Sequence, residues 1–470
     1  MRKTKIVCTI GPSSDNEEVL EKMCRAGMNV ARLNFSHGTH EEAEKKIEKL
    51  RNVREKLHYP LAILLDTKGP EYRIRTFKEG KVTLQDGAEF TFTAEQTQGD
   101  EKHVAVSYPH LAKELSVGDP ILLNNGLMRF SVVRIEGDDV VCRVDIGGVL
   151  SDRKSMSFPG KVLKQVYLSE QDKADIAFGV KHGVDYIACS FVSCKQDLTD
   201  VKNYLNEIGG GGIDLIAKIE NRSGVDNIEE ICSECEGIMI GRGDMGVEIP
   251  YEELPAIQKK LITKCRLLGK RVITATEMLE SMIVSPRPTR AEISDVANAV
   301  YDGTSATMLS GETAAGKYPV EAVAAMARIA EYTEREIDYE HRFARSDFRI
   351  KNTVDAISHA TCGMANDVKA RAIVVNTLSG KTARMVSRFR PVADIVAFTT
   401  SEKTWRKLAL SWGVTPCLSP IFDNVSDMFE QTAFETKKLL RLEKGEKIVL
   451  TGGLTDGTSG NTDLVKIQTV

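Results

Sequence analysis

Short apolar runs alternate with longer segments of helical periodicity along the first two thirds of the chain. Each run has the length of one buried β-strand, and charged residues dominate the segments between runs. Eight such runs occur before residue 310: 5–10, 28–35, 61–65, 185–191, 213–219, 237–240, 271–276 and 304–309. Eight strands that alternate with helices form a closed barrel, so we expect an α/β fold built on a TIM (β/α)8 barrel.

The segments between the runs have the spacing of amphipathic helices. Ala43, Ile47 and Leu50 recur every three or four residues, with charged side chains at the other positions. Thr289 and Glu292 have the spacing of a capping box, which predicts that a helix begins there.

The alternation breaks twice, which predicts two further domains. Short alternating strands with glycine-containing turns occupy about 90 residues after the third run, so we expect an inserted all-β lid over 70–159. The barrel would then comprise 1–69 and 160–330. A second series, with a helix at 353–368 and strands at 372–376, 395–399, 447–450 and 464–470, predicts a C-terminal α/β domain over 331–470.

Composition excludes several classes of protein. The 470 residues carry 63 Lys+Arg and 67 Asp+Glu, a net charge of −4, so a basic nucleic-acid-binding protein is not expected. No run approaches the ~20 apolar residues that cross a membrane, and the N-terminus has no signal-peptide pattern. Ten cysteines are scattered along the chain, and Cys232-x-x-Cys235 has no second pair nearby, which favours reduced thiols in the cytoplasm.

Polar residues accumulate where the predicted strands end, the place at which barrel enzymes hold their reactive groups. After the second run, alternation places Arg32, Asn34 and Ser36 on one face. After the third, Asp66 and Thr67 supply hard oxygen ligands. Arg73 follows as a donor to anions, although a solvated strand end would also accommodate these residues.

The later strands add a cation, two carboxylates and two hydroxyls. Lys218 and Glu220 share a face of the fifth strand, and Asp244 follows the sixth. Two carboxylates without a nearby histidine suit Mg²⁺ better than zinc, although Lys218 and Glu220 could also form an ordinary ion pair. The hydroxyls of Thr276 and Ser310 could relay a proton, or the two side chains could simply pack against their neighbours.

Residues 241–246 also match G-x-G-x-x-G, the pattern of dinucleotide-binding folds. We reject that interpretation because we expect no helix to begin within the motif, and no strand with an acidic end follows about 20 residues later. Cations and metal ligands around an anion-sized space are instead what phosphoryl transfer requires. No nucleophile with an adjacent base is visible, which favours direct transfer.

At this point the chain resembles the pyruvate kinase family over nearly its whole length. The motifs that match in order and spacing are 5–12, 32–38, 66–71, 218–221, 242–250, 286–292 and 302–316. The resemblance implies transfer of the phosphoryl group of phosphoenolpyruvate to ADP, which gives pyruvate and ATP. It also implies dependence on Mg²⁺ (or Mn²⁺) and K⁺, allosteric control and a homotetramer.

Site residues follow from the resemblance motif by motif. Arg32 would hold the phosphate, Lys218 would stabilise the transferring group, and Gly243 and Thr276 would contact the substrate carboxylate, with Asp244 beside it. The remaining assignments are Glu220 and Asp244 for Mg²⁺; Asn34, Ser36, Asp66 and Thr67 for K⁺, supported by Glu71; and Asn34, His37, Arg73 and Lys154 for the nucleotide.

The C-terminal domain has a candidate phosphate cradle where a strand leads into a helix. Its residues are Thr377, Ser379, Gly380, Lys381 and Thr382, and the glycine-rich segment 452–461 could close over them. An ordinary helix cap explains the same pattern. The family implies a sugar-phosphate effector such as fructose 1,6-bisphosphate, and we expect no additional C-terminal domain of the kind that some bacterial relatives carry.

Several positions depart from the family's usual residues: Gly241, Glu277, Ser305, Thr307, Asn124 and Asn125. Glu277 adds a negative charge next to Thr276, so substrate affinity is the property we expect it to change. Two other functions fit the residues: a lyase that forms an Mg²⁺-stabilised enolate, and a sensor without catalytic activity that keeps only the C-terminal phosphate site.

Overall fold

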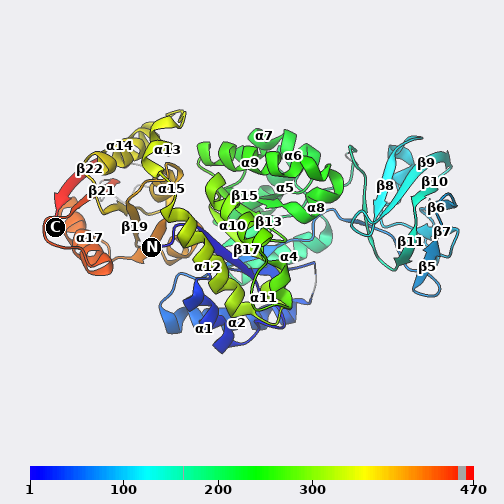
Figure 1. Cartoon of the computed structure of the whole chain (residues 1–470), viewed down its shortest axis with the longest axis horizontal. Helices are drawn as coiled ribbons and strands as arrows, with labels where there is room; N and C mark the ends of the chain where they lie inside the picture. Colours follow the sequence, from blue (N-terminus) through cyan, green and yellow to red (C-terminus); the bar gives the residue numbers. More distant parts are fainter. Residues whose placement is uncertain (37, 162, 454–461) are drawn as a thin grey trace.

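The computed structural model describes residues 1–36, 38–161, 163–453 and 462–470. Figure 1 shows three bodies in a row, with the barrel between an all-β body and a C-terminal body. The barrel closes in the order β1-β17-β16-β15-β14-β13-β3-β2, with every neighbouring pair parallel. Its strands are β1 (Lys5–Thr9), β2 (Val30–Asn34), β3 (Ala62–Asp66), β13 (Tyr186–Cys189), β14 (Asp214–Ile219), β15 (Gly237–Gly241), β16 (Arg271–Ala275) and β17 (Ala306–Leu309). All eight predicted strands and the predicted fold class are confirmed.

Helices cover the outside of the barrel. The predicted helix start at Thr289 is confirmed, because a capping box there begins α10, and a second capping box at Thr39 begins α2. The helices are α1 (Glu17–Ala26), α2 (His40–Leu57), α4 (Glu170–Lys181), α5 (Lys195–Glu207), α6 (Arg222–Asp226), α7 (Ile228–Ser233), α8 (Arg242–Glu248), α9 (Leu254–Leu267), α10 (Arg290–Asp302), α11 (Gly311–Ala314) and α12 (Pro319–Arg335), with 3₁₀ turns η1 (Tyr251–Glu253) and η2 (Glu280–Ile283).

One expectation about this region was wrong. Helix α8 begins at Arg242, inside the glycine-rich motif, because Gly241 ends β15 and acts as the N-cap. The dinucleotide-binding interpretation still fails, since β15 lies between β14 and β16 in a closed barrel and not in an open doubly wound sheet.

The interior of the barrel explains where the polar strand ends point. Val30, Leu64 and Ile216 belong to one buried cluster inside the ring of strands. Side chains two residues further along a strand point to the same face. Arg32, Asp66 and Lys218 each come two residues after a member of that cluster. Their side chains therefore point to the inside of the barrel at its carboxyl rim.

The inserted body is a lid domain with a core of its own, packed around buried Phe90, Phe92 and Phe130. Its sheets are ordered β4-β12-β8-β9-β10-β6-β7 and β11-β5. The elements are β4 (Tyr72–Arg73), β5 (Lys81–Leu84), β6 (Glu89–Thr93), β7 (His103–Ala105), α3 (Leu111–Glu114), β8 (Pro120–Leu123), β9 (Met128–Glu136), β10 (Asp139–Ile146), β11 (Gly148–Ser151) and β12 (Ser155–Ser157). The short alternating strands that the sequence predicts within this domain, at 90–94, 103–107, 130–135 and 140–144, correspond to β6, β7, β9 and β10.

The C-terminal body is a five-stranded sheet ordered β20-β19-β18-β21-β22, in which only β22 is antiparallel to its neighbour. Its elements are α13 (Tyr339–Arg345), α14 (Thr353–Asp367), β18 (Ala372–Asn376), α15 (Lys381–Arg388), β19 (Asp394–Thr399), α16 (Glu402–Leu408), β20 (Val414–Leu418), α17 (Val425–Leu440), β21 (Lys447–Gly453) and β22 (Thr462–Thr469). Sequence analysis missed the edge strand β20.

The C-terminal body closes the amino end of the barrel, opposite the rim. Ala409 and Leu410, which follow α16, belong to the same buried cluster as the barrel interior. Beside them the Asp214 carboxylate lies 2.8 Å from Arg271 and 2.6 Å from Lys407, with Arg384 at 3.4 Å. These ion pairs join the first residue of β14 to the C-terminal domain.

We expect Asp214→Asn to lower the urea midpoint of unfolding by an amount that depends on pH. Burial works against ionisation of Asp214, but its three cations lower its pKa to about 2 from an ordinary 3.8. The pairing therefore contributes fully above about pH 4 and is lost as pH falls toward 2, a contribution on the order of 2 kcal/mol. The loss at pH 7 should be larger, about 3 kcal/mol, because the buried Arg271 and the half-buried Arg384 and Lys407 lose their partner.

The control for that measurement is Asp226→Asn, the same substitution at an exposed position. Its urea midpoint should match that of the parent at every pH. A midpoint for Asp214→Asn that stays equal to the parent's at pH 7 would contradict the account.

All ten cysteines are free thiols. Cys232 and Cys235 are buried, and the Cys232 sulfur lies 3.6 Å from that of Cys265. Burial raises the pKa of Cys24 to about 12, so this thiol stays protonated at neutral pH. In the described part of the chain no group of three or more His, Cys, Asp or Glu is arranged to hold a metal ion, and no helix is long and apolar enough to span a bilayer.

Candidate active site

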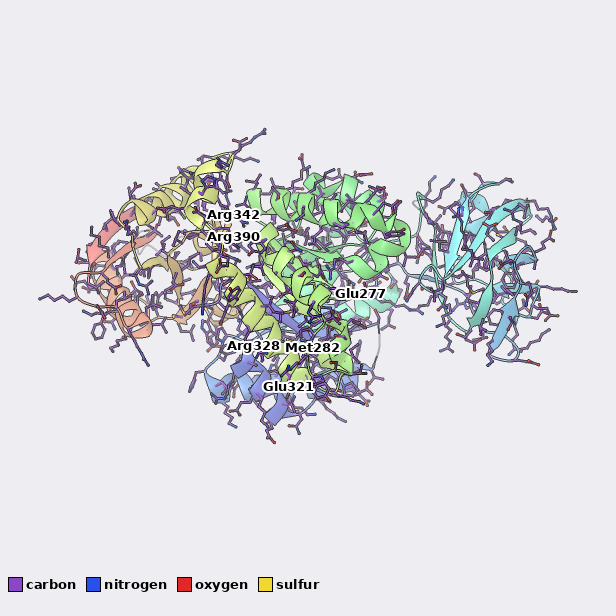
Figure 2. The ribbon with its side chains drawn as sticks, viewed as in Figure 1. Glu277, Met282, Glu321, Arg328, Arg342 and Arg390 are labelled. Carbon is purple, nitrogen blue, oxygen red and sulfur yellow. The ribbon has the colours of Figure 1, made fainter. Side chains whose placement is uncertain are left out.

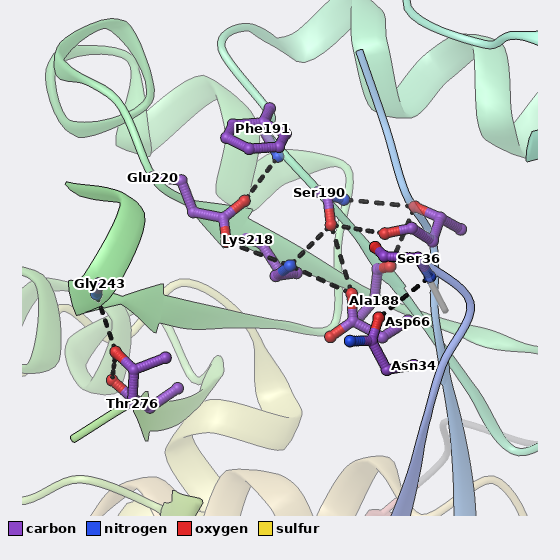
Figure 3. A network of polar contacts seen from close by, with 12 residues as sticks. Asn34, Ser36, Asp66, Ala188, Ser190, Phe191, Lys218, Glu220, Gly243 and Thr276 are labelled. Atoms are coloured by element: carbon purple, nitrogen blue, oxygen red, sulfur yellow. Dashed lines mark hydrogen bonds and ion pairs between the residues drawn. The ribbon is translucent and has the colours of Figure 1, made fainter. Parts of the chain in front are cut away.

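The carboxyl rim of the barrel holds a compact network of charges, which Figure 3 shows from close by. The Lys218 ammonium lies 3.1 Å from a carboxylate oxygen of Asp66 and 3.1 Å from one of Glu220. It also donates a 2.6 Å hydrogen bond to the Ser190 hydroxyl. Lys218 is only 9% exposed. Two carboxylates from neighbouring parts of the rim therefore hold its ammonium group in place, away from solvent.

The electrostatic balance of this network keeps Lys218 charged. Burial alone would favour the neutral amine, but Asp66 and Glu220 together raise the pKa of Lys218 above its ordinary value. Burial likewise works against ionisation of Asp66, whose pKa Arg32 and Lys218 hold below the usual range. The site therefore contains a permanent buried cation that faces the rim.

Arg32 is the second cation of the rim. Its Nε donates to Asp66 at 2.6 Å, and its Nη1 donates to the Thr9 hydroxyl at 3.0 Å. Both partners lie on neighbouring strands, so the guanidinium plane is held in one orientation. A fixed guanidinium of this kind is well suited to bind an anion through its remaining N–H groups.

Glu220, Asp244 and Glu248 are among the carboxylates that line a cavity of about 280 Å³ between the rim and the lid domain, which Glu71 and Asp197 also line. Burial, opposed by Lys218 and reinforced by Asp244, raises the pKa of Glu220 to about 7. Burial together with Asp244 and Glu220 raises the pKa of Glu248 to about 7 as well. Glu220, which is buried, and Asp244, which is exposed, offer two carboxylates of the kind that a divalent cation prefers.

Thr276 and Gly243 meet on the far side of the rim. The Gly243 amide donates to the Thr276 hydroxyl at 2.8 Å, and that hydroxyl donates to the Ala275 carbonyl at 2.6 Å. Thr276 has φ 71°, in the left-handed region that a β-branched residue rarely adopts. Such a strained conformation at the end of a strand often marks a functional position.

Ser310 lies at the end of β17 with a buried hydroxyl oxygen that has no hydrogen-bond partner among the described residues. Its backbone amide donates to Glu312. An unpartnered buried hydroxyl has lone pairs and a proton available for a molecule bound at the rim.

The predicted K⁺ residues lie on the opposite side of Lys218 from Thr276 (Figure 3). The Asn34 side-chain oxygen accepts from the Ser36 amide at 3.1 Å, and Asp66 is the residue that Lys218 and Arg32 share. The Thr67 hydroxyl donates to the Ala188 carbonyl at 3.3 Å. Oxygen atoms from β2 and β3 thus gather beside the buried cation.

Comparisons with known proteins agree with this geometry. The family model described as "Pyruvate kinase, barrel domain" matches residues 1–323, and "Pyruvate kinase, alpha/beta domain" matches 355–468. A pyruvate kinase of Clostridium acetobutylicum is 45% identical over all of both chains. One from Geobacillus stearothermophilus is 44% identical over this whole chain and 80% of its own length. The solved structure of a Cryptosporidium parvum pyruvate kinase matches with a TM-score of 0.95 and 37% identity, over 100% of this chain and 96% of that one.

The chain belongs to the pyruvate kinase family. It is a phosphotransferase that converts phosphoenolpyruvate and ADP into pyruvate and ATP. The family also indicates metal dependence. These matches span the catalytic barrel and favour the kinase over the lyase and sensor alternatives.

Two of the predicted nucleotide residues, Arg73 and Lys154, lie where the lid domain joins the barrel, and Asn34 lies at the end of β2. Arg73 pairs with Glu71 at 2.5 Å and donates to the Arg153 carbonyl at 2.6 Å. The Lys154 carbonyl accepts from Ile74 at 3.0 Å, so Lys154 lies beside β4. His37 lies outside the described residues.

The predicted effector segment leads from β18 into α15. The Gly380 amide donates to the Thr377 hydroxyl at 3.0 Å, and Gly380 has φ 78°. Lys381 is exposed at the start of the helix, and the buried Thr382 hydroxyl lies 2.5 Å from that of Thr462. Ser379 lies between Thr377 and Gly380 in the sequence. Most of the glycine-rich segment, 454–461, lies outside the described residues.

Sequence analysis missed two residues of the site. Ser190 donates to the Thr67 carbonyl at 2.6 Å and accepts from Lys218, so it joins β3 to β14. It could have been found, because it follows the fourth predicted strand just as Asp66 follows the third. Glu248 could not, since it lies on the last turn of an α8 helix that we did not expect.

The structure shows what surrounds the residues that depart from the family's usual pattern. A Cβ at Gly241 would lie 2.7 Å from a Glu220 carboxylate oxygen, so glycine leaves room for that side chain. The Ser305 hydroxyl accepts from the Val272 amide at 3.1 Å, and the Thr307 hydroxyl contacts Met326. Asn124 and Asn125 have φ 53° and 56°, which asparagine tolerates in a turn.

We expect Glu277→Gln to lower the apparent KM for phosphoenolpyruvate by no more than about threefold, because an exposed charge is screened by solvent. Glu277 follows Thr276 directly, and its side chain is exposed (Figure 2). Initial rates against phosphoenolpyruvate concentration at low and high salt provide the measurement. The KM difference should shrink at high salt, and identical KM values at low salt would show that the charge does not reach the substrate.

Proposed function

We propose that the rim network performs the phosphoryl transfer of this pyruvate kinase, with Arg32 and Lys218 as the groups that hold and neutralise the transferring phosphate. The observation that carries the proposal is the buried Lys218 ammonium between Asp66 and Glu220, each at 3.1 Å. A cation positioned before the reaction stabilises charge that develops on the phosphoryl oxygens without reorganisation.

The transfer breaks the bond between phosphorus and the enol oxygen of phosphoenolpyruvate and forms a bond to a terminal phosphate oxygen of ADP. Negative charge then lies on the enolate of pyruvate, next to Lys218. A proton added at the methylene carbon completes pyruvate. We assign the relay of that proton to Thr276 and Ser310, whose hydroxyls lie at the ends of β16 and β17.

Glu220 and Asp244 are the residues that would hold Mg²⁺ or Mn²⁺, and Glu248 would reinforce the negative charge of the cavity. Such a cation supplies charge neutralisation at the phosphoryl and carboxylate oxygens of the substrate. Gly243 and Thr276 would orient the substrate carboxylate. Arg73, Lys154, Asn34 and His37 would face the nucleotide, with Lys154 coming from the lid as it rejoins the barrel.

We propose that Asn34, Ser36, Asp66 and Thr67 hold K⁺. Replacing K⁺ by tetramethylammonium at constant ionic strength should then lower the rate of ATP formation at least about tenfold, which corresponds to ~1.4 kcal/mol of transition-state stabilisation. A coupled assay of ATP formed from ADP and phosphoenolpyruvate gives the rate. Equal rates in the two salts would exclude a K⁺ role, and an absence of ATP in both would exclude the kinase itself.

The C-terminal segment that contains Thr377, Ser379, Gly380, Lys381 and Thr382 is the effector site that we propose, for a phosphorylated metabolite. Its support is the left-handed Gly380 before the first turn of α15, where backbone amides favour an anion. Activity titrated against a panel of sugar phosphates and nucleotides tests this. We further propose a homotetramer in the cytoplasm, which sedimentation analysis and cell fractionation would check.

A further inference from the structure

A second cavity, of about 150 Å³, lies between the barrel and the C-terminal domain. Three arginines from three separate segments line it: Arg266 from α9, Arg342 from α13 and Arg390, which follows α15. Figure 2 shows Arg342 and Arg390 close together where the C-terminal domain meets the barrel, away from Glu277 at the rim. The aromatic rings of Tyr339 and Trp412 also line this cavity.

Arg390 is a buried cation that has no carboxylate partner in the part of the chain that the structure describes. It is 5% exposed, and its guanidinium donates only to neutral oxygens, among them the Gly303 carbonyl at 2.9 Å and the Ser305 hydroxyl at 3.1 Å. Its Nε has no hydrogen-bond partner among the described residues. A buried charge in this state is costly unless an anion compensates it.

The other two arginines are no better compensated. Arg266 donates to the Ser346 hydroxyl at 3.4 Å and lies over the Phe348 ring, with 5.6 Å from its guanidinium carbon to the ring centre. Arg342 is half-buried and makes no ion pair within the part of the chain that the structure describes. Three guanidinium groups therefore face one small cavity.

The acidic residues nearby are already engaged. Asp302 lines the cavity, but its carboxylate pairs with Lys259 and accepts from Gln258 at 3.3 Å. Glu334 accepts from the backbone amides of Lys3 and Thr4, at 2.8 and 2.6 Å. The cavity thus keeps an excess of positive charge.

The electrostatics of Arg390 agree with this geometry. Burial, together with the charges of Arg266 and Arg342, lowers the pKa of Arg390 to about 9 against the opposing effects of Tyr339 and Glu334. An anion between the guanidinium groups would restore their ordinary preference for the charged form.

We propose that this cavity is a binding site for a phosphate group, either as inorganic phosphate or as part of a small phosphorylated metabolite. Guanidinium groups bind phosphate through paired N–H donors, and three of them match its three exposed oxygens. The Arg390 guanidinium lies over the Trp412 ring at 4.5 Å, which keeps it fixed. A ligand here would join α9 of the barrel to α13 and to the segment after α15.

The test uses the tryptophan in the lining as its reporter. The chain has two tryptophans, so in the full-length Trp405→Phe variant all tryptophan emission comes from Trp412. Titration with inorganic phosphate, and separately with glycerol 3-phosphate, should change this emission in a saturable way. Tighter binding of glycerol 3-phosphate would indicate a metabolite, and tighter binding of inorganic phosphate would indicate the free ion.

Arg342→Gln in that background should raise the phosphate concentration for half-saturation at least about tenfold, because one of three charged donors is lost. The substitution removes no described ion pair, so the fold should remain intact, and an unchanged melting temperature confirms that. Arg328→Gln is the matched control, since Arg328 is exposed on α12 away from the cavity (Figure 2). It should leave the titration unchanged.

Two results would overturn the proposal: no saturable change in Trp412 emission with either probe, or equal half-saturation in the Arg342→Gln and Arg328→Gln proteins. Phosphate that binds at the rim would not be affected by Arg342→Gln, so a failure here leaves the catalytic assignment standing.

Discussion

Lys218→Met is expected to lower kcat about a thousandfold, the upper range for removal of one group that stabilises developing charge. The ammonium is 9% exposed and lies 3.1 Å from both Asp66 and Glu220, so no water or neighbouring cation replaces it. Loss of the cation also leaves the buried Glu220 carboxylate without its ion-pair partner, whereas Asp66 keeps Arg32 at 2.6 Å. Steady-state rates of ATP formation measure the effect.

The matched control is Lys22→Met, which removes an exposed lysine whose partner is Glu18 on the same helix. Its kcat should equal that of the parent. Because unpaired buried carboxylates reduce stability, melting temperatures and ADP affinity should be compared, so that loss of folding is separated from loss of catalysis. Unchanged turnover in a folded Lys218→Met protein would contradict the assignment of Lys218.

Glu220→Gln is expected to raise the Mg²⁺ concentration for half-maximal activity at least about a hundredfold, or ~2.7 kcal/mol of binding. Glutamine preserves the shape of the side chain but removes a charge that is 2% exposed and faces Asp244 across the cavity. It also removes an acceptor of the Phe191 amide hydrogen bond, at 2.9 Å, that fixes the carboxylate. Activity measured over a wide range of Mg²⁺ concentrations gives the shift.

Glu229→Gln serves as the control for that experiment, since Glu229 is exposed and pairs only with Lys264 among the ion pairs described. The two variants differ in whether the lost carboxylate lies at the rim. If both required the same Mg²⁺ concentration as the parent, Glu220 would not be a metal ligand.

Alternation along the barrel strands is the reason that so much of the site was predictable. A strand buried on both faces still points alternate side chains inward, and the first polar residue past the apolar core must lie at the rim. Arg32, Asp66 and Lys218 follow this rule. Ser190 follows it too, because it lies two residues after Ala188 of the same inner cluster.

Features that depend on tertiary placement were not predictable. Helix α8 begins inside a glycine-rich motif with Gly241 as its N-cap, and its last residue, Glu248, lines the cavity. Strand β20 contains Pro416, which cannot donate a ladder hydrogen bond, so its local pattern argues against a strand although proline is tolerated at a sheet edge. The arginine cavity joins Arg266, Arg342 and Arg390, which are far apart in the sequence.

The central claim is that one rim of the barrel gathers Lys218, Glu220 and Asp244 around the transferring phosphate. Anomalous diffraction from crystals grown with Mn²⁺ and oxalate, an analogue of the enolate, tests it most directly. The account predicts a single strong peak at the rim, bonded to Glu220 and Asp244, with oxalate oxygens facing Lys218 and Gly243. A manganese peak bonded elsewhere, with oxalate absent from the rim, would contradict it.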